Sequence, residues 1–96
     1  MIQDLNKAFE SRIRLGIMSV LLANDWVDFK SLKDYLEATD GNLSSHISAL
    51  EKMGYLEARK EFVGKRPRST YRVTMDGRAA FTVHLNALEV LLKNKK

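Results

Sequence analysis

The sequence contains no cysteine, a single proline and five glycines among its 96 residues. The absence of cysteine excludes a disulfide framework and any metal site built from thiolates, and it argues against thiol-based redox sensing. The few glycines form no phosphate-cradling motif, and the zinc-protease pattern H-E-x-x-H is missing as well. These absences remove several large classes of enzyme from consideration.

Long apolar runs are missing too. The longest near the start, GIMSVLLA, is far too short to span a bilayer. The opening residues, MIQDLNKAFESRIRLG, carry charges throughout and lack the apolar segment of a signal peptide. We therefore expect a soluble, cytoplasmic protein with no membrane partner.

Side chains suited to a catalytic or metal centre are sparse. The two histidines, His46 and His84, fall in different predicted helices, and no cluster of carboxylates stands at metal-ligand spacing beside them. We expect neither catalysis nor a cofactor. The length of the chain predicts one domain over residues 1–96.

Positive charge is concentrated in one part of the chain. The net charge is +4, yet residues 1–58 carry six basic and nine acidic side chains. Residues 59–72 carry six basic side chains against one acidic, and residues 73–96 carry four against two. A local basic patch of this kind is typical of contact with a polyanion such as nucleic acid.

Apolar residues recur at three- and four-residue steps near the start of the chain, which predicts a first helix over about 5–23. A short apolar segment at 26–29 follows and is suited to a single strand. Ser31 is a candidate N-cap for a second helix that stops near Ala38, with Tyr35 among its inward-facing residues.

A third helix is predicted over about 40–53, because Thr39 can cap it and Gly54 lies where a C-terminal glycine belongs. Its apolar stripe extends to Met53. Only a few residues separate this helix from the second, which is the spacing of a helix-turn-helix.

Two strands and a last helix complete the pattern. Residues 55–62 alternate loosely and residues 69–74 are rich in β-branched and aromatic side chains, which favours an antiparallel pair. The intervening VGKRPR predicts a loop with a basic tip, and Thr74 can cap a helix over about 75–93. The expected fold class is mainly α with a small β-wing (α+β), in the order helix, strand, helix, helix, strand, strand, helix.

Two segments carry a family resemblance. TDGNLSSHISALEKMGYLE contains the run S-S-H-I-x-x-L-E-x-x-G-Y-L-E from Ser44, and EFVGKRPRSTYRVTMDGRAAF contains Y-R-V-T-x-x-G-R from Tyr71. In these segments the chain resembles the winged helix-turn-helix transcriptional regulators of the MarR/ArsR type, especially their short stand-alone group. The resemblance implies a recognition helix that passes into the first wing strand, a wing that leads into the last helix, DNA binding and a homodimer. It leaves the regulatory target open.

The outer side of the third helix is suited to contact with DNA. When Leu43, Ile47 and Leu50 face the core, short polar side chains remain on or beside the exposed side, namely Asn42, Ser44, Ser45, His46 and Ser48. Such side chains let a helix approach base edges in the major groove, where asparagine can pair with adenine and serine can reach bases or phosphates. A merely solvated helix face would be expected to carry more charge.

The basic loop is the second candidate contact. Lys65, Arg66 and Arg68 at its tip can neutralise phosphates, and an arginine can enter the minor groove. Pro67 restricts the loop, so less entropy is lost on binding. We predict a wing over about 62–70 on the DNA backbone or in the minor groove; a solvated hairpin is the simpler alternative.

The last helix carries more apolar residues than a small core needs. Four of them recur at heptad-like spacing: Phe81, Leu85, Leu88 and Leu92. The first helix shows a similar excess. We predict a homodimer through the terminal helices, with half-sites on the DNA about 34–36 Å apart. The alternative is that these residues only cover the core of the monomer.

Two other kinds of binding protein compete with a regulator that binds double-stranded DNA. A winged helix can serve as a protein–protein interaction module, but such a module needs no basic wing. A protein that binds RNA or single strands favours exposed aromatic rings, and we expect none on the third helix or at the wing tip. No polar cluster indicates a small-molecule effector.

Overall fold

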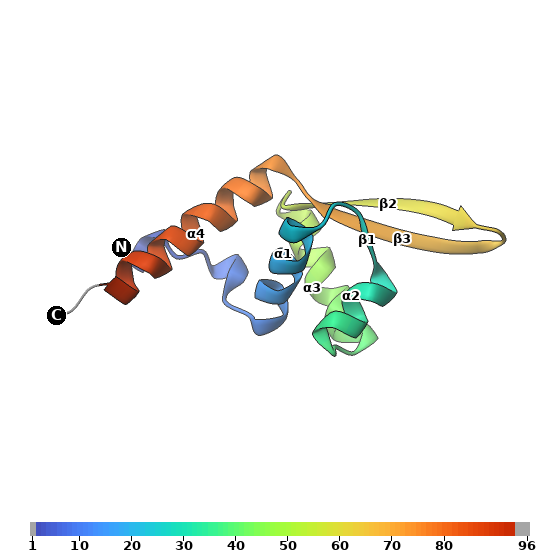
Figure 1. The fold of residues 1–96 in the computed structure, drawn as a ribbon, viewed down its shortest axis with the longest axis horizontal. Helices are drawn as coiled ribbons and strands as arrows, with labels where there is room; N and C mark the ends of the chain where they lie inside the picture. The colour runs from blue at the N-terminus through green and yellow to red at the C-terminus, as the bar shows by residue number, and fades with distance from the viewer. Residues whose placement is uncertain (1, 94–96) are drawn as a thin grey trace.

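The computed structural model describes residues 2–93, and these form four α-helices and one three-stranded antiparallel sheet (Figure 1). Two short 3-10 turns, η1 (Ile2–Asp4) and η2 (Lys7–Phe9), come first. The other elements are α1 (Arg12–Ala23), β1 (Val27–Asp28), α2 (Phe29–Leu36), α3 (Asp40–Lys52), β2 (Leu56–Val63), β3 (Arg66–Val73) and α4 (Met75–Lys93). The predicted fold class and element order are confirmed.

The first helix starts later than predicted. It begins at Arg12, not at the start of the range 5–23, because the Ser11 side chain caps it by accepting a hydrogen bond from a backbone N–H in its first turn. Upstream, the side chain of Asn6 caps η2 in the same way. Phe9 is fully buried although it lies outside α1, so the apolar pattern runs without a break across both elements.

α2 and α3 form the helix-turn-helix. Asp28, not Ser31, caps α2: its carboxylate accepts hydrogen bonds from the Ser31 backbone N–H and hydroxyl at 3.2 and 2.7 Å. The hydroxyl hydrogen bond is the main reason why the pKa of Asp28 lies below its ordinary value. Between the helices Glu37 adopts a left-handed backbone with φ 50°. Thr39 caps α3, as predicted, by accepting a hydrogen bond from the Asn42 N–H at 3.2 Å.

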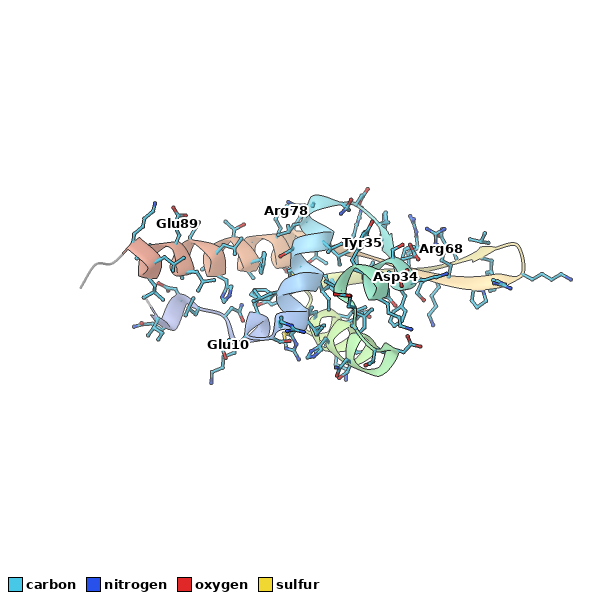
Figure 2. The ribbon with its side chains drawn as sticks, turned by 60° about the horizontal axis from the view of Figure 1, so that its bottom comes forward. Glu10, Asp34, Tyr35, Arg68, Arg78 and Glu89 are labelled. Carbon is cyan, nitrogen blue, oxygen red and sulfur yellow. The ribbon has the colours of Figure 1, made fainter. Side chains whose placement is uncertain are left out.

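Two side chains predicted to face inward are exposed instead. Tyr35 is 68% exposed at the surface of α2 (Figure 2), and Leu32 takes the inner position. Met53 is 45% exposed, because it is the C-cap of α3, where the chain already turns toward Gly54 at φ 81°. The apolar stripe of α3 therefore ends one turn earlier, at Leu50.

The core lies where α1, α2 and α3 meet the base of the sheet. It includes the buried side chains of Phe9, Ile17, Met18, Leu21, Leu32, Leu43, Ile47, Leu50, Leu56, Val73 and Phe81. The ring centroid of Phe9 lies 5.0 Å from that of Phe81 and 5.5 Å from that of Tyr55. These aromatic contacts attach the N-terminal segment to α4 and to the start of β2.

The sheet has the order β1-β3-β2. β2 and β3 pair over all eight residues of each strand. The connection between them is therefore much shorter than the predicted loop. It is a turn of Gly64 and Lys65 alone, with Gly64 at φ 66°. Pro67 lies in β3 opposite Phe62, beyond the short pairing with β1, where β3 is an edge strand that tolerates proline. The wing, meaning β2, β3 and their turn, is thus a regular two-stranded ribbon for much of its length.

α4 begins beside the end of α3. Thr74 caps it, as predicted: the Thr74 hydroxyl accepts a hydrogen bond from the Gly77 N–H at 3.0 Å and donates one to the Gly54 carbonyl at 2.6 Å. The Thr74 backbone N–H donates to the Tyr55 carbonyl at 3.0 Å. Gly77 packs directly on Tyr55, where a Cβ would lie 2.2 Å from the carbonyl oxygen. The wing therefore leaves and rejoins the body at one hydrogen-bonded junction.

The molecule is elongated, with extents of 58 × 25 × 21 Å. The wing projects from one side of the cluster of α1, α2 and α3, and α4 projects from the other, with the N-terminal segment beside it (Figure 1). The Asn6 backbone N–H holds this segment in place by donating a hydrogen bond to Nδ1 of His84 at 3.0 Å. His84 is 4% exposed and belongs to this packing.

Candidate nucleic-acid interface

From residue 41 to residue 48 the outer face of α3 consists of short, uncharged side chains, and the exposed Glu51 and Lys52 follow at the end of the helix. Asn42, Ser44, Ser45 and Ser48 are all exposed, where the sequence pattern placed them. Gly41 begins the row, and no atom lies within 4 Å of the position that a Cβ would occupy there. Residues 41, 44, 45 and 48 share one side of the helix, because three- and four-residue steps return to the same face. The α3 backbone can therefore approach another surface closely.

His46 lies beside that face and is only partly exposed, so its contact with DNA stays a prediction. It is partly buried, and its Nδ1 accepts a hydrogen bond from Nε of Arg14 at 2.9 Å. Burial, and then the Arg14 charge, lower the pKa of His46. Arg14 also donates to the Ala8 carbonyl at 3.4 Å. This arginine therefore joins α1, α3 and the N-terminal segment.

An ion pair connects the start of α3 to α2. Nζ of Lys33 lies 2.8 Å from Oδ1 of Asp40, and the hydrogen bond between them raises the pKa of Lys33. Both side chains are largely solvated, so the pair contributes little to stability. The pair matters for electrostatics instead. The positive charge of Lys33 compensates the carboxylate of Asp40, which lies beside the uncharged face of α3.

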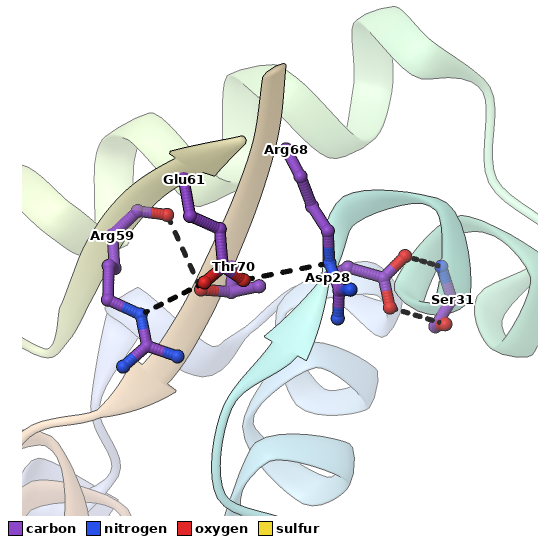
Figure 3. A network of polar contacts seen from close by, with 6 residues as sticks. All are labelled: Asp28, Ser31, Arg59, Glu61, Arg68 and Thr70. Carbon is purple, nitrogen blue, oxygen red and sulfur yellow. Dashed lines mark hydrogen bonds and ion pairs between the residues drawn. The ribbon is translucent and has the colours of Figure 1, made fainter. Parts of the chain in front are cut away.

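One face of the wing is covered by ion pairs (Figure 3). Glu61 lies between Arg59 and Arg68, with N···O distances of 3.9 and 3.8 Å. Arg72 pairs with Glu57 on the neighbouring strand and with an aspartate that precedes β1. Three of the six basic side chains in this stretch are therefore matched by carboxylates.

The other three wing cations, Lys60, Lys65 and Arg66, have no carboxylate at ion-pair distance within residues 2–93. Lys60 points to the opposite face from Glu61, since side chains alternate along a strand. Lys65 is in the turn, whereas Arg66 and Arg68 lie in β3 and not in a loop. Lys60 thus joins the predicted wing contacts, and the period-two alternation of β2 is the sequence signal that identifies it.

Trp26 packs beside the ion-paired face. The guanidinium carbons of Arg59 and Arg72 lie 4.3 and 4.7 Å from the centroid of its ring, which is cation–π distance. Trp26 is partly buried at the edge of the sheet. It therefore holds two of the paired arginines against the body of the protein.

An exposed aromatic ring lies near the wing tip, where none was predicted. Phe62 is 74% exposed, and its neighbour Val63 is 56% exposed. Phe62 stands opposite Pro67, in the second residue pair from the turn. The turn was predicted to be longer, which is why Phe62 was expected at the end of a strand and away from the tip.

The residues predicted for dimerisation differ in exposure. Phe81 is 2% exposed and packs in the core against Phe9, so its prediction as a surface contact is wrong. Leu85 and Leu92 are 44% and 85% exposed, and Leu88 is partly buried. The outer part of α4 thus presents an apolar surface that the described part of the chain does not cover.

Two further observations on residues 2–93 concern metal ligands and membrane-spanning helices. Nowhere in this range do three His, Cys, Asp or Glu side chains gather in positions that could hold a metal ion. Both histidines accept hydrogen bonds from the protein itself. Within the same residues, every helix is too short or too polar to cross a membrane.

Comparison with known proteins gives matches over most of the chain. Residues 13–92 match the family model described as a winged helix DNA-binding domain. An uncharacterized protein of Methanocaldococcus jannaschii is 34% identical over 88 residues, which cover 92% of this chain and 96% of that protein.

Solved structures give a similar result. A transcriptional regulator homologue from Pyrococcus horikoshii OT3 has a TM-score of 0.71 and 32% identity, over 96% of this chain and 99% of that chain. The transcriptional repressor BigR from Xylella fastidiosa has a TM-score of 0.70 and 23% identity, over 98% and 88%. A putative MarR-like regulator from Bacillus cereus has a TM-score of 0.69 and 21% identity, over 93% and 67%. The last two share the fold alone.

Proposed function

This chain belongs to the family of winged-helix DNA-binding domains, and from that membership we propose that it is a transcriptional regulator that recognises a specific sequence of double-stranded DNA. In this proposal α3 enters the major groove, and the wing contacts the backbone or the adjacent minor groove. The observation that carries it is the division of charge: residues 41–48 of α3 offer an uncharged face, while Lys60, Lys65 and Arg66 on the wing have no acidic partner in the described residues.

The α3 face supports base contacts. Asn42 offers the amide that pairs with adenine through two hydrogen bonds, and three serines offer hydroxyls to bases or phosphates. Asp40, the carboxylate nearest to this face in sequence, is already paired with Lys33, so its charge repels phosphates less. Gly41 adds space for a close approach.

The wing supports phosphate contacts. Each phosphate that a cation neutralises contributes about −0.9 to the slope of log affinity against log salt. The three unpaired wing cations therefore account for a slope of about −2.7 in each protomer, if each meets one phosphate. The ion-paired arginines contribute less, because a phosphate must compete with Glu57 or Glu61.

A homodimer through the outer part of α4 fits the exposed Leu85 and Leu92. Because α4 and the wing project from opposite sides of the cluster of α1, α2 and α3, such a dimer leaves both α3 faces and both wings free (Figure 1). Two half-sites about 34–36 Å apart would then be contacted.

Selection of bound duplexes from a randomised double-stranded pool tests the function. We expect enrichment of an inverted repeat with half-sites about one helical turn apart. No enrichment, even at low salt where phosphate contacts are strongest, would favour a protein–protein interaction module instead.

A pair of single variants tests the wing. Lys65→Ala should weaken binding to every duplex and reduce the salt slope by about 0.9 for each protomer. Arg78→Ala removes the same charge from an exposed position on α4 (Figure 2) and should change neither quantity. Equal salt slopes for the wild type and Lys65→Ala would exclude the turn from the interface.

A further inference from the structure

We propose that Phe62 is an apolar wedge, which the wing inserts into the minor groove of bound DNA to open a base step and bend the duplex. This inference rests on the proposed DNA-binding function and deepens it, because it assigns a contact to an uncharged side chain. It replaces the prediction of a wing tip that is only polar.

Phe62 is exposed to a degree that other phenyl rings in the chain are not. It is 74% exposed, whereas Phe9 and Phe81 are 0% and 2% exposed. Single exposed apolar residues are ordinary on protein surfaces. Here, however, Phe62 stands opposite Pro67 in the second residue pair from the turn, so two apolar side chains share one ribbon face, and Val63, which is 56% exposed, lies on the other. This cluster lies at the end of the wing, where residues 2–93 offer no cover.

The charges around the ring identify its partner. Lys60 lies two residues before Phe62 on the same ribbon face, Lys65 follows in the turn, and Arg66 begins β3 on the other face, opposite Val63. None of the three has a carboxylate partner in the described residues. An apolar group surrounded by free cations complements a groove with phosphate walls. Proteins that bind the minor groove insert phenylalanine between base steps in this setting and kink the duplex.

The opposite ribbon face cannot make the same contact. It carries Arg59, Glu61 and Arg68, which pair with one another (Figure 3). The ribbon therefore has one face with the apolar ring and the unpaired Lys60, and one face without an aromatic ring, on which Arg66 lies beyond the ion-paired arginines. Only the first of these faces can insert an aromatic ring into a groove.

The wing is long enough to reach the minor groove beside the major groove that α3 occupies. β1 last pairs with Thr70, which stands opposite Arg59, and Gly64 lies five residues beyond Arg59 along β2. At about 3.3–3.4 Å per residue the free ribbon spans roughly 17 Å. With half-sites one helical turn, about 34–36 Å, apart, the minor groove lies roughly half a turn, or about 17 Å, from the major groove that α3 occupies. Pro67 stiffens the strand opposite the ring, so the ring is held in place.

The test uses the duplex obtained from the selection, with 2-aminopurine placed at each position in turn and a dye at each end. The wild-type protein should raise 2-aminopurine fluorescence at one step and bring the two dyes closer together. Phe62→Ala should abolish both changes and bind about tenfold to hundredfold more weakly. Its salt slope should equal that of the wild type, since no phosphate contact is removed.

Two further variants make the result specific. Val63→Ala removes an exposed apolar side chain from the opposite ribbon face and should behave as the wild type. Phe62→Leu should restore part of the bend, because leucine also serves as a wedge. Circular dichroism should show all variants folded, since the ring lies outside the core.

Three outcomes would overturn the inference. Unchanged fluorescence and bending in Phe62→Ala would show that the ring opens no base step. A lower mass of Phe62→Ala in sedimentation would make the ring a contact between copies of the chain. A wild-type protein that binds no duplex at low salt would refute the proposed function itself and the wedge with it, whereas binding without bending would refute the wedge alone.

Discussion

Replacing Gly77 with alanine should strongly destabilise this protein, although the same change stabilises most helices. The added methyl group would lie 2.2 Å from the Tyr55 carbonyl oxygen and 2.9 Å from its carbonyl carbon. Both atoms belong to the backbone at the start of β2, so no flexible side chain can move aside. α4 must shift away from the junction where Thr74 bonds to Gly54 and Tyr55.

The magnitude follows from three contributions. Overpacking costs about 1–3 kcal/mol. The shift also weakens the two hydrogen bonds of Thr74 to Gly54 and Tyr55, each of which contributes about 1 kcal/mol. Alanine is favoured over glycine inside a helix by about 1 kcal/mol, which offsets part of the loss. We therefore expect the free energy of unfolding to fall by about 2–4 kcal/mol.

Urea unfolding followed by far-ultraviolet circular dichroism measures this loss, at a fixed protein concentration because a dimer gains stability with concentration. The thermal midpoint should fall by roughly 8–32 °C, at about 4–8 °C for each kcal/mol in a domain of this size. Gly41→Ala is the matched control: it lies in α3 with open space around its Cβ position and should gain up to about 1 kcal/mol. A Gly77→Ala protein at least as stable as the wild type would refute the reasoning.

Three other outcomes are expected. The free energy of unfolding should fall as the pH drops through about 6.5, because the lowered pKa of His46 lets the unfolded state bind more protons. The His46→Gln protein should lose that part of the pH dependence. If urea titrations gave parallel curves of unfolding free energy against pH for the variant and the wild type, this expectation would be contradicted. Glu37→Gly should raise the free energy of unfolding by about 1 kcal/mol, since a φ of 50° strains a residue with a Cβ; an unchanged urea midpoint would count against it. Leu92→Lys should yield a monomer in sedimentation equilibrium with an unaltered circular dichroism spectrum, and an unaltered mass would exclude the end of α4 from the dimer.

Helix ends were predictable wherever the signal is local. Thr39 and Thr74 cap their helices because a hydroxyl oxygen can reach the backbone N–H three residues later. Gly54 follows α3 with positive φ, as a C-terminal glycine does. These three residues also lie within the two segments, 39–57 and 61–81, that carried the family resemblance.

Helix ends that depend on tertiary structure were not predictable. Asp28 and Ser31 are both good N-caps, and the choice between them depends on where β1 pairs with β3. Phe9 continues the apolar pattern of α1 from outside the helix, because its ring is buried against Phe81. The apolar periodicity of the sequence therefore cannot show where the helix begins when a residue of the preceding turn is buried in the same core.

The candidate interface was predictable in part for a similar reason. Exposure of Asn42 and the serines follows from helix periodicity alone. The environment of His46 does not, because its partner Arg14 lies 32 residues away on α1. Which wing cations are free depends on strand register, and the register became known only with the length of the turn. The tight turn is also what makes Phe62 a residue of the tip.

The position of Trp26 gives the protein its own optical reporter. The sequence contains one tryptophan, so indole emission comes from a single place in the fold. That place is beside two guanidinium groups carried by opposite strands of the wing, Arg59 on β2 and Arg72 on β3. Any event that pulls either strand away from the body changes the charge and solvent around the indole. Motion at the base of the wing can therefore be followed in real time on unlabelled protein.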